Sequence, residues 1–486
     1  MTRITTKPTK STKTGLATKN RRITKYKSTF VVFEFFVAKR LGVLCGFLLC
    51  LTGGASAQET AAQGLALRIS LEDAQSKAVA ASHRLAEARA RVATADAAIA
   101  VPQAADRPIV ALGAGYTRTN HVTEFLFPGP TGVPRVLYPD APDNYRTRLD
   151  LQWPIYSGGR VDALENVARA EASAAAADVA TAQADLRLEV ARAFWALVTA
   201  RATAAVLDQS LARAQAQVND VRQRLAAGLV PPNEVASAEA QESRQRMLLI
   251  QTRNQRDLSS AELARLIGAD LLRPIEPAAA LDLTTAQDLS EPTATSMGGF
   301  TAEALAMRDE RRALEFRIEA AGEQRAAAER ARRPVIAVTG GLDYARPNPR
   351  IFPRAEAWDD SWDVGVAASW SLWDGGRARA AAALAGSVAV AAQERLAEFD
   401  SIVVLEIRQR MLEIDSGRAA VAAADDTVRA AAEARRVVAE RYRAGVITQT
   451  EVLDADVALL EAELDRTRAM AGVRFAEARL ARALGR

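Results

Sequence analysis

Cysteine and histidine are almost absent from this chain. Its only cysteines are Cys45 and Cys50, both near the N-terminus, and its only histidines are His83 and His121. A disulfide framework or a thiolate metal site needs cysteines in the body of the chain, so both are excluded there. The two histidines have no second ligand at metal-binding spacing. The sequence therefore predicts no metal and no cofactor.

The residue patterns of common enzyme sites are also missing. The chain has no G-x-S-x-G nucleophile motif, no phosphate-binding loop and no H-E-x-x-H pair. Paired carboxylates such as Asp359-Asp360 are sequence neighbours in a predicted loop, where they cannot face each other across a substrate. The sequence therefore does not favour an enzyme.

Basic residues are concentrated at the start of the chain. The first forty residues hold eleven Lys or Arg and a single acid, Glu34, and after them Lys77 is the only lysine. The formal net charge is +4 for the whole chain, and it becomes −6 when counted from Gln58 onward. A nucleic-acid-binding face needs basic residues on the folded body, so no nucleic-acid partner is expected.

The N-terminal segment has the pattern of a secretion signal. Basic Lys39-Arg40 precede the apolar run Leu41–Leu51, which is too short to span a bilayer as a helix. Ala55-Ser56-Ala57 forms a small-x-small cleavage site, so residues 1–57 are predicted to be removed before Gln58. We expect translation to start downstream, near Val37. The alternative is a cytosolic protein with an apolar start.

The body of the chain contains two copies of one plan. Three motifs recur at a constant offset of 217 residues, and they are Trp153-Pro-Ile-Tyr-Ser-Gly-Gly-Arg160 with Trp370-Ser-Leu-Trp-Asp-Gly-Gly-Arg377, Arg224–Gly228 with Arg441–Gly445, and Ala264–Gly268 with Ala481–Gly485. Upstream, Arg107-Pro-Ile-Val-Ala-Leu matches Arg333-Pro-Val-Ile-Ala-Val at an offset of 226. We therefore predict a first repeat at 58–268, a link at 269–300 and a second repeat at 301–486.

Each repeat is predicted to be mainly helical. Residues 71–101 and 301–333 are rich in helix-forming Ala, Glu and Arg, and 160–227 and 377–444 contain no proline. A helix of 68 residues is roughly 100 Å long, about three times a bilayer core, and charges recur along it, so it must stand in water.

Two apolar stripes follow the first long helix. One is Leu186, Val190, Ala193 and Leu197, and the other is Leu188, Ala191, Trp195 and Val198. The second copy repeats the first stripe as Val403, Ile407, Arg410 and Ile414, with Arg410 expected at its edge. Two adjacent stripes predict a helix with neighbours on both flanks, as in a wall of helices, whereas an ordinary coiled coil needs one seam.

Four short segments alternate apolar and polar residues and are predicted strands. Tyr145–Trp153 and Trp362–Leu372 have aromatic ends, and their partners are Pro108–Tyr116 and Pro334–Tyr344. Loops rich in Pro, Gly and Asp separate the partners at His121–Asn144 and Ala345–Ser361. Segments of this kind fit transmembrane barrel strands, and the alternative is a soluble β-domain with one wet face.

Four strands cannot close a barrel, because about eight is the working minimum. An unpaired strand edge is not tolerated in lipid, so the strands predict an oligomer to which each chain contributes four strands.

These motifs and their order resemble the TolC family of outer-membrane efflux proteins over nearly all of the chain after the leader. The resemblance rests on Leu71-Glu-Asp-Ala, on the two Gly-Gly-Arg motifs, and on Arg441-Tyr-Arg-Ala-Gly-Val-Ile-Thr-Gln-Thr-Glu-Val-Leu-Asp-Ala455. It implies a homotrimer in the outer membrane, with a twelve-stranded barrel and a long periplasmic helical tunnel. It further implies a passive channel for efflux or type I secretion that works with a periplasmic adaptor and an inner-membrane transporter.

Three sets of residues are candidates for function or for key geometry. Gly158, Gly159, Gly375 and Gly376, with Trp153 and Trp370 beside them, are predicted to form the strand-to-helix corners, because glycine turns there without a Cβ clash. By resemblance, the turns at Gly228–Pro232 and Gly445–Gln449 meet the adaptor through Arg224, Leu225, Gly228, Leu229, Arg441, Tyr442, Gly445 and Val446. The alternative is a plain helix turn.

Acidic residues follow each turn. Glu234 and Glu451 occupy equivalent positions, and Asp454 lies one helical turn further. By resemblance, acids at this point of the second repeat ring the tunnel entrance, where symmetry would bring several carboxylates together. The alternative role is to complement the helix dipole.

Two other protein classes compete with a channel. A periplasmic coiled-coil adaptor would carry a glycine-rich lipoyl-like domain and no aromatic-ended strands, and a structural helical scaffold would be water-soluble. The exported substrate cannot be inferred from the residues.

Overall fold

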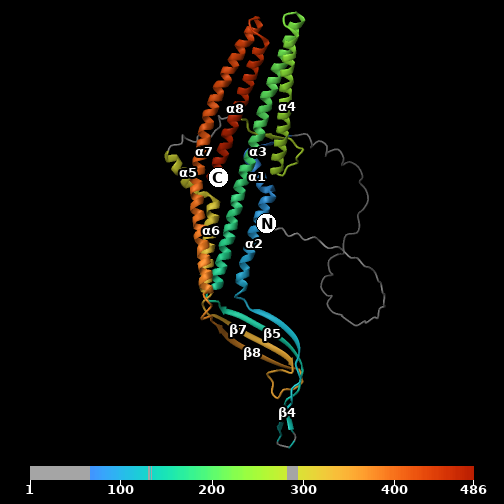
Figure 1. Ribbon diagram of the computed structural model, residues 1–486, viewed down its shortest axis with the longest axis vertical. Coiled ribbons are helices and arrows are strands. Elements are labelled where there is room, and N and C mark those ends of the chain that lie inside the picture. Colours follow the sequence, from blue (N-terminus) through green and yellow to red (C-terminus); the bar gives the residue numbers. More distant parts are fainter. Residues whose placement is uncertain (1–65, 130–131, 133, 282–293) are drawn as a thin grey trace, which may run out of the picture. The chain divides into compact units, whose positions relative to one another are not determined.

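The computed structural model describes residues 66–129, 132, 134–281 and 294–486 (Figure 1). The predicted leader, its cleavage site and both cysteines lie outside the described residues. Part of the predicted link also lies outside them.

The described chain alternates helices with short strands. The elements are β1 (Leu67–Ile69), α1 (Leu71–Ala81), α2 (His83–Ala104), β2 (Ile109–Arg118), β3 (Phe125–Pro128), β4 (Pro134–Tyr138), β5 (Asp143–Tyr156), α3 (Arg160–Ala226), α4 (Pro232–Leu266), β6 (Ile275–Pro277), α5 (Ala294–Met307), α6 (Asp309–Arg330), β7 (Val335–Arg346), β8 (Asp359–Ser369), α7 (Arg377–Arg443) and α8 (Gln449–Ala483).

The repeat predicted from the motifs is present in the helices. Helices α3 and α7 have 67 residues each, and α4 and α8 have 35 each. Both pairs are shifted by the same 217 positions, from 160 to 377 and from 232 to 449. Figure 1 shows α4 returning beside α3, and α8 returning beside α7. The two long helices thus follow one template.

The shorter predicted helices are each broken in two, which corrects the expectation of continuous helices over 71–101 and 301–333. Ser82 separates α1 from α2 in an extended conformation, and its hydroxyl accepts a bond from the N–H of Leu85 at 3.3 Å. At the equivalent place Arg308 separates α5 from α6, and its Nε donates to the carbonyl of Ala483 at 2.8 Å. Each break therefore caps a helix end.

Four strands form one antiparallel sheet in the order β2-β5-β7-β8. Each of the four predicted strands is present, and β5 is longer than expected. Strand β8 ends at Ser369, so Trp370–Leu372 lie outside it, which corrects the predicted strand Trp362–Leu372. The sheet runs from the first repeat directly into the second, through the β5–β7 pairing.

Two further strand pairs were not predicted. The segment expected to be a loop at His121–Asn144 contains the hairpin β3–β4. In the link, β6 pairs in parallel with β1, and α5 begins before the expected start of the second repeat. Both pairs are short and lack a clear alternating pattern.

Helix α3 packs against α1, α2, α4, α6 and α8, whereas α7 packs against α5, α6 and α8. Leu186, Val190, Ala193 and Leu197 are all buried, as their stripe predicts. In α7 the stripe contains Val403, Ile407, Met411 and Ile414, so Met411 occupies the place expected for Arg410. The side chain of Arg410 lies at the edge, paired with Glu413 at 2.7 Å.

By length and composition alone, α3 is apolar enough to cross a membrane, but half of that apolar window is buried inside the fold. Its apolar residues join Leu85 of α2 and Leu263 of α4 in one core cluster. The hydrophobicity of α3 is therefore used in helix packing.

Candidate functional site: helix turns and strand sheet

The two helix turns are built alike. Gly228 and Gly445 have positive φ angles of 68° and 73°. The residue after each glycine donates its N–H to the carbonyl five residues earlier, at 2.9 Å for Leu229 and 3.0 Å for Val446. This is a glycine helix ending that satisfies carbonyls at the helix terminus. It leaves Leu229 72% and Val446 66% exposed, so each turn presents one apolar side chain to its surroundings.

The remaining predicted turn residues differ in accessibility. Arg441 is exposed, and Leu225 is half-buried. Tyr442 is only 5% exposed and lies under Arg224, whose guanidinium carbon is 4.5 Å from the ring centre. Arg224 and Tyr442 therefore contact each other within one chain. The exposed members of the predicted set are the turn glycines Gly228 and Gly445 and the side chains of Leu229, Val446 and Arg441.

Tyr442 joins the end of α7 to the beginning of α4. Its hydroxyl donates to Glu234 Oε2 at 3.4 Å, and its carbonyl accepts from Arg224 Nη1 at 3.4 Å. Arg224 is held in turn by Asp220 at 3.0 Å. Burial, followed by the nearby Glu234 carboxylate, raises the pKa of Tyr442 above its usual 10.0. This group, here called the tip junction, links the two repeats close to both turns.

The three predicted entrance acids fall into two environments. Glu234 is half-buried in the tip junction, while Glu451 and Asp454 are exposed on the first turns of α8. Neither Glu451 nor Asp454 makes a hydrogen bond or ion pair within the described part of the chain. Glu234 is therefore bound within one chain, and the other two carboxylates are exposed.

The strand-to-helix corners are tight turns made by paired glycines. Gly158, Gly159, Gly375 and Gly376 have φ angles of 69°, 78°, 67° and 88°. At the first corner Arg333 Nη1 donates to the carbonyl of Gly158 at 3.0 Å. These glycines carry the chain from β5 into α3 and from the end of β8 into α7.

The two corner tryptophans anchor the corners in the same way. Trp153 Nε1 donates to the carbonyl of Asp106 at 3.2 Å, and Trp370 Nε1 donates to that of Arg332 at 2.9 Å. Each bond ties a corner to the residues just before β2 or β7. Both rings remain about half exposed or more, at 45% and 62%.

One face of the sheet is apolar. Leu112, Leu149, Leu342 and Trp362 are paired across all four strands and are exposed. Toward the loops an aromatic row crosses the same face, with ring centres 5.0 Å apart for Tyr116–Tyr145 and for Tyr344–Trp358, and 5.9 Å apart for Tyr145–Trp358. An exposed apolar face bordered by aromatic rings is typical of a lipid-facing sheet.

The opposite face carries a network of ion pairs. Asp343 of β7, with only 3% of its side chain exposed, accepts from Arg146 Nε at 2.6 Å and from Arg148. Arg148 also binds Asp150 at 2.6 Å and Asp363 of β8 at 3.2 Å. The alternation in β5 predicts that its charged residues share a face, but their partners depend on a register of strands about 200 residues apart, which the sequence does not reveal.

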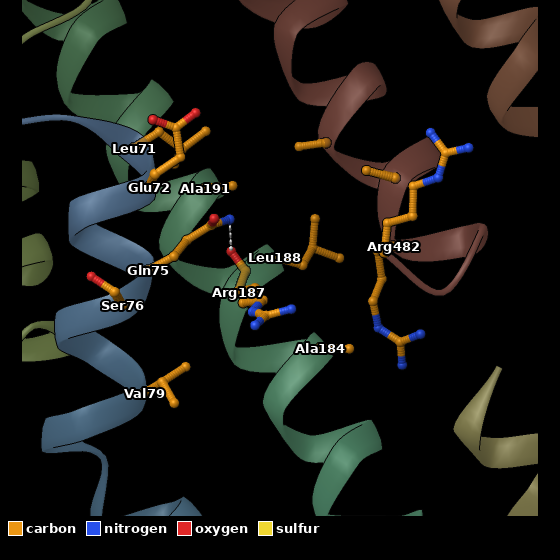
Figure 2. Close-up of a pocket in the computed structure, with 13 residues that line it drawn as sticks. Leu71, Glu72, Gln75, Ser76, Val79, Ala184, Arg187, Leu188, Ala191 and Arg482 are labelled. Atoms are coloured by element: carbon orange, nitrogen blue, oxygen red, sulfur yellow. Dashed lines mark hydrogen bonds between the residues drawn. The ribbon is translucent and has the colours of Figure 1, made fainter. Parts of the chain in front are cut away.

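A groove of about 490 Å³ lies where α1, α3 and α8 meet. Figure 2 shows Gln75 of α1 donating to the carbonyl of Arg187 of α3, a bond of 3.2 Å, with Arg482 of α8 across the groove. Arg482 is bound to Asp185 at 2.6 Å and Glu310 at 2.5 Å. The charged groups here hold helices together. Within the described residues, no cluster of His, Cys, Asp or Glu could hold a metal ion.

Comparisons with known proteins agree with this architecture. Residues 74–269 and 301–486 match the family described as outer membrane efflux protein. No curated protein matches the chain.

Several solved structures share the fold. One is CusC, whose structures concern folding and transmembrane channel formation, with a TM-score of 0.72, 17% identity and coverage of 85% of this chain and 92% of that chain. The outer membrane protein VceC of Vibrio cholerae has a TM-score of 0.69, 22% identity and coverage of 85% and 96%. The outer membrane channel MtrE of Neisseria gonorrhoeae has a TM-score of 0.68, 21% identity and coverage of 85% and 88%.

Proposed function

Because the chain belongs to the outer membrane efflux protein family, we propose that it is the outer-membrane channel of a tripartite efflux or type I secretion system. In this role it carries out no chemistry and is a passive conduit for solutes to the exterior. The observation that carries the proposal is a four-stranded sheet with one apolar face, one charged face and two open edges, joined to helices of 67 residues.

The open edges require additional copies of the chain. Strands β2 and β8 each pair on one side only within the sheet. Unpaired backbone groups are costly in lipid, and about eight strands are the minimum for a closed barrel. A homotrimer, as the family resemblance implies, supplies twelve strands and pairs β2 of each copy with β8 of the next. The apolar face then contacts outer-membrane lipid, and the charged face lines the lumen.

The length of the strands supports this placement. Tyr145 and Trp153 mark the two aromatic ends of β5, a segment within the fourteen residues of that strand. A transmembrane strand tilted by about 45° needs about 9–11 residues, which is the length of the segment from Tyr145 to Trp153. The helices beyond the corner at Gly158 then lie in the periplasm.

The helices also leave apolar side chains without partners in one chain. On α7, Leu384, Leu405 and Leu412 are 69%, 55% and 56% exposed and lie along one helix face, and on α4 Ile250 is 62% exposed. In the trimer these faces pack between copies and complete a closed tunnel of helices.

The helix turns are the proposed end of the tunnel that meets the other components. Exposed Leu229, Val446 and Arg441 would contact the hairpin of a periplasmic adaptor, which connects the channel to an inner-membrane transporter. Glu451 and Asp454 of three copies would form an acidic ring at the entrance, where they attract cations. A periplasmic adaptor, one of the two competing classes, is not proposed, because the family match covers both repeats.

The proposal is tested on the purified protein. We expect it to require detergent, and to migrate on an SDS gel as an oligomer that becomes a monomer only on heating. Leu405→Glu, which places a charge on the unpartnered face of α7, should lower the oligomer fraction. Gln393→Glu adds the same charge at an exposed position about 120° around α7 from Leu405 and should leave it unchanged. A monomer that remains in the aqueous fraction without detergent would refute the proposed function.

A further inference from the structure

The outer end of the sheet carries a loop that folds back onto the charged face. Residues 347–358 connect β7 to β8, and they contact β8 on the side of Ser361 and Asp363. Trp362 and Val364 alternate with these residues and are exposed on the apolar face, at 72% and 73%. Residues 347–350 therefore lie on the charged face, whereas Trp358 at the end of the loop stacks on the aromatic row of the apolar face.

Two residues hold this loop down. Asn348 is 2% exposed, and its Nδ2 donates to the carbonyl of Asp359 at 3.0 Å and to Ser361 Oγ at 3.1 Å. Arg350 Nη2 lies 3.2 Å from Asp363 Oδ1, and its Nη1 donates to the carbonyl of Trp362 at 2.6 Å. Both contacts are made with β8, so the loop is fixed to the strand that follows it.

The distal part of the loop is fixed to the β3–β4 hairpin. The N–H of Arg354 donates to the carbonyl of Leu137 at 3.2 Å. Its guanidinium binds the hydroxyl of Tyr138 and lies 5.0 Å from the centre of that ring. The loops of the two repeats are thus joined to each other beyond the sheet.

Arg350 extends the ion-pair network of the charged face. Asp363 binds both Arg350 and Arg148, and Arg148 binds Asp343, which is buried. A buried carboxylate that loses its partners is strongly destabilising, so this network resists rearrangement. The position of Arg148 also requires glycine at residue 341, because a Cβ on Gly341 would lie 2.1 Å from Arg148 Nη2.

We propose that the first part of this loop, residues 347–354, forms a fixed constriction at the outer end of the conduit, held on the lumen face by Asn348 and Arg350. This inference rests on the proposed function, which makes the charged face the lumen. The network pairs Arg146, Arg148 and Arg350 with Asp150, Asp343 and Asp363, so its charges balance. The constriction therefore selects by size more than by charge, and it lies at the opposite end of the conduit from the helix turns.

Two neighbouring positions on β2 provide the test. Ile109 pairs with Gln152 and lies on the charged face, two residues further from the loop than the level of Asp363, whereas Val110 lies on the apolar face. Each is replaced by cysteine in a chain with Cys45 and Cys50 changed to alanine, so that it is the only thiol. Intact cells are then treated with a polyethylene glycol maleimide too large for general porins.

With the loop in place, Ile109→Cys should react slowly. The double change Asn348→Ala with Arg350→Ala should raise its labelling rate about tenfold. Hydrogen bonds to charged groups stabilise the loop on the charged face by at least that factor, and the double variant loses them. The matched control Arg135→Ala removes a cation from the β3–β4 hairpin, where it makes no hydrogen bond or ion pair with the loop among the described residues, and it should leave the rate unchanged. Val110→Cys should stay unlabelled throughout.

Two results separate the failure of this inference from that of the proposed function. An unchanged labelling rate of Ile109→Cys in the double variant, with Val110→Cys still protected, would overturn the constriction and leave the barrel standing. Equal labelling of Ile109→Cys and Val110→Cys in every variant would mean that the sheet is not a barrel wall, and both would fall.

Discussion

Replacing Gly158 by alanine should destabilise the protein more than the same change at Gly375. The two glycines occupy equivalent corners and have nearly equal φ angles of 69° and 67°. Alanine in this left-handed region costs about 1–2 kcal/mol at either position. The surroundings differ, because a Cβ at Gly158 would lie 2.7 Å from Arg333 Cβ, whereas nothing lies within 4 Å of a Cβ at Gly375.

The close contact at Gly158 cannot be relieved by a flexible side-chain end. The opposing atom is the Cβ of Arg333, and this residue also donates to the carbonyl of Gly158 at 3.0 Å, which fixes the spacing. Overpacking of this kind adds about 1–3 kcal/mol. We therefore expect Gly158→Ala to cost about 2–5 kcal/mol and Gly375→Ala about 1–2 kcal/mol.

The free energy of unfolding can be followed by the helical circular dichroism signal of the detergent-solubilised protein in increasing urea. Gly375→Ala is the internal control, since it carries the backbone cost without the contact. Equal losses, or a larger loss for Gly375→Ala, would refute the reasoning from the Arg333 contact.

Three other perturbations give sharp expectations. Asp374 accepts two backbone N–H bonds at the start of α7, which lower its pKa below 3.8; Asp374→Ala should therefore lower the thermal midpoint at pH 7, and its difference from wild type should shrink as pH falls below 3.8 and be lost once pH has passed the lower pKa of the folded state. The pKa of Tyr442 is raised above 10.0, so the stability that its neutral hydroxyl gives the tip junction is present below pH 10 and is lost as pH rises beyond it; urea midpoints between pH 8 and pH 11 should fall more for wild type than for Tyr442→Phe. Replacing Glu451 and Asp454 together by alanine should lower conductance and abolish cation block in a planar bilayer, and unchanged values of both would remove the acidic ring.

The long helices and the main strands were predictable because their signals are local. Glycine and proline mark the ends of α3 and α4, and the duplicated motifs fix the same ends for α7 and α8. The alternation of β5 assigns Arg148 and Leu149 to opposite faces without reference to any other strand. The hydrophobic periodicity of a segment and the glycines and prolines that end it are properties of a few neighbouring residues, so they can be read from the sequence alone.

The features that the sequence did not reveal depend on distant partners. Arg308 interrupts a helical pattern because it caps the end of α8 through the carbonyl of Ala483. Arg148 finds Asp343 only through the register of β5 on β7. Met411, and not Arg410, lies in the buried stripe, because the helices packed against α7 determine which of its faces is buried as much as its hydrophobic periodicity does. Each case needs contacts between distant parts of the chain, 175 positions apart for Arg308 and Ala483 and 195 for Arg148 and Asp343.

The two repeats share a template but differ in what covers them, and this difference indicates where a second copy belongs. Helix α3 packs against five other helices, whereas α7 packs against α5, α6 and α8 and leaves Leu384, Leu405 and Leu412 exposed. Strand β8, which leads into α7, is also an edge of its sheet. The other edge of the sheet is β2, which directly follows α2 in the sequence. One neighbouring copy that presents its β2 and α2 side to β8 and α7 satisfies the open backbone edge and the open apolar stripe together. A head-to-tail contact of this kind forms a closed ring when its rotation divides evenly into a full turn.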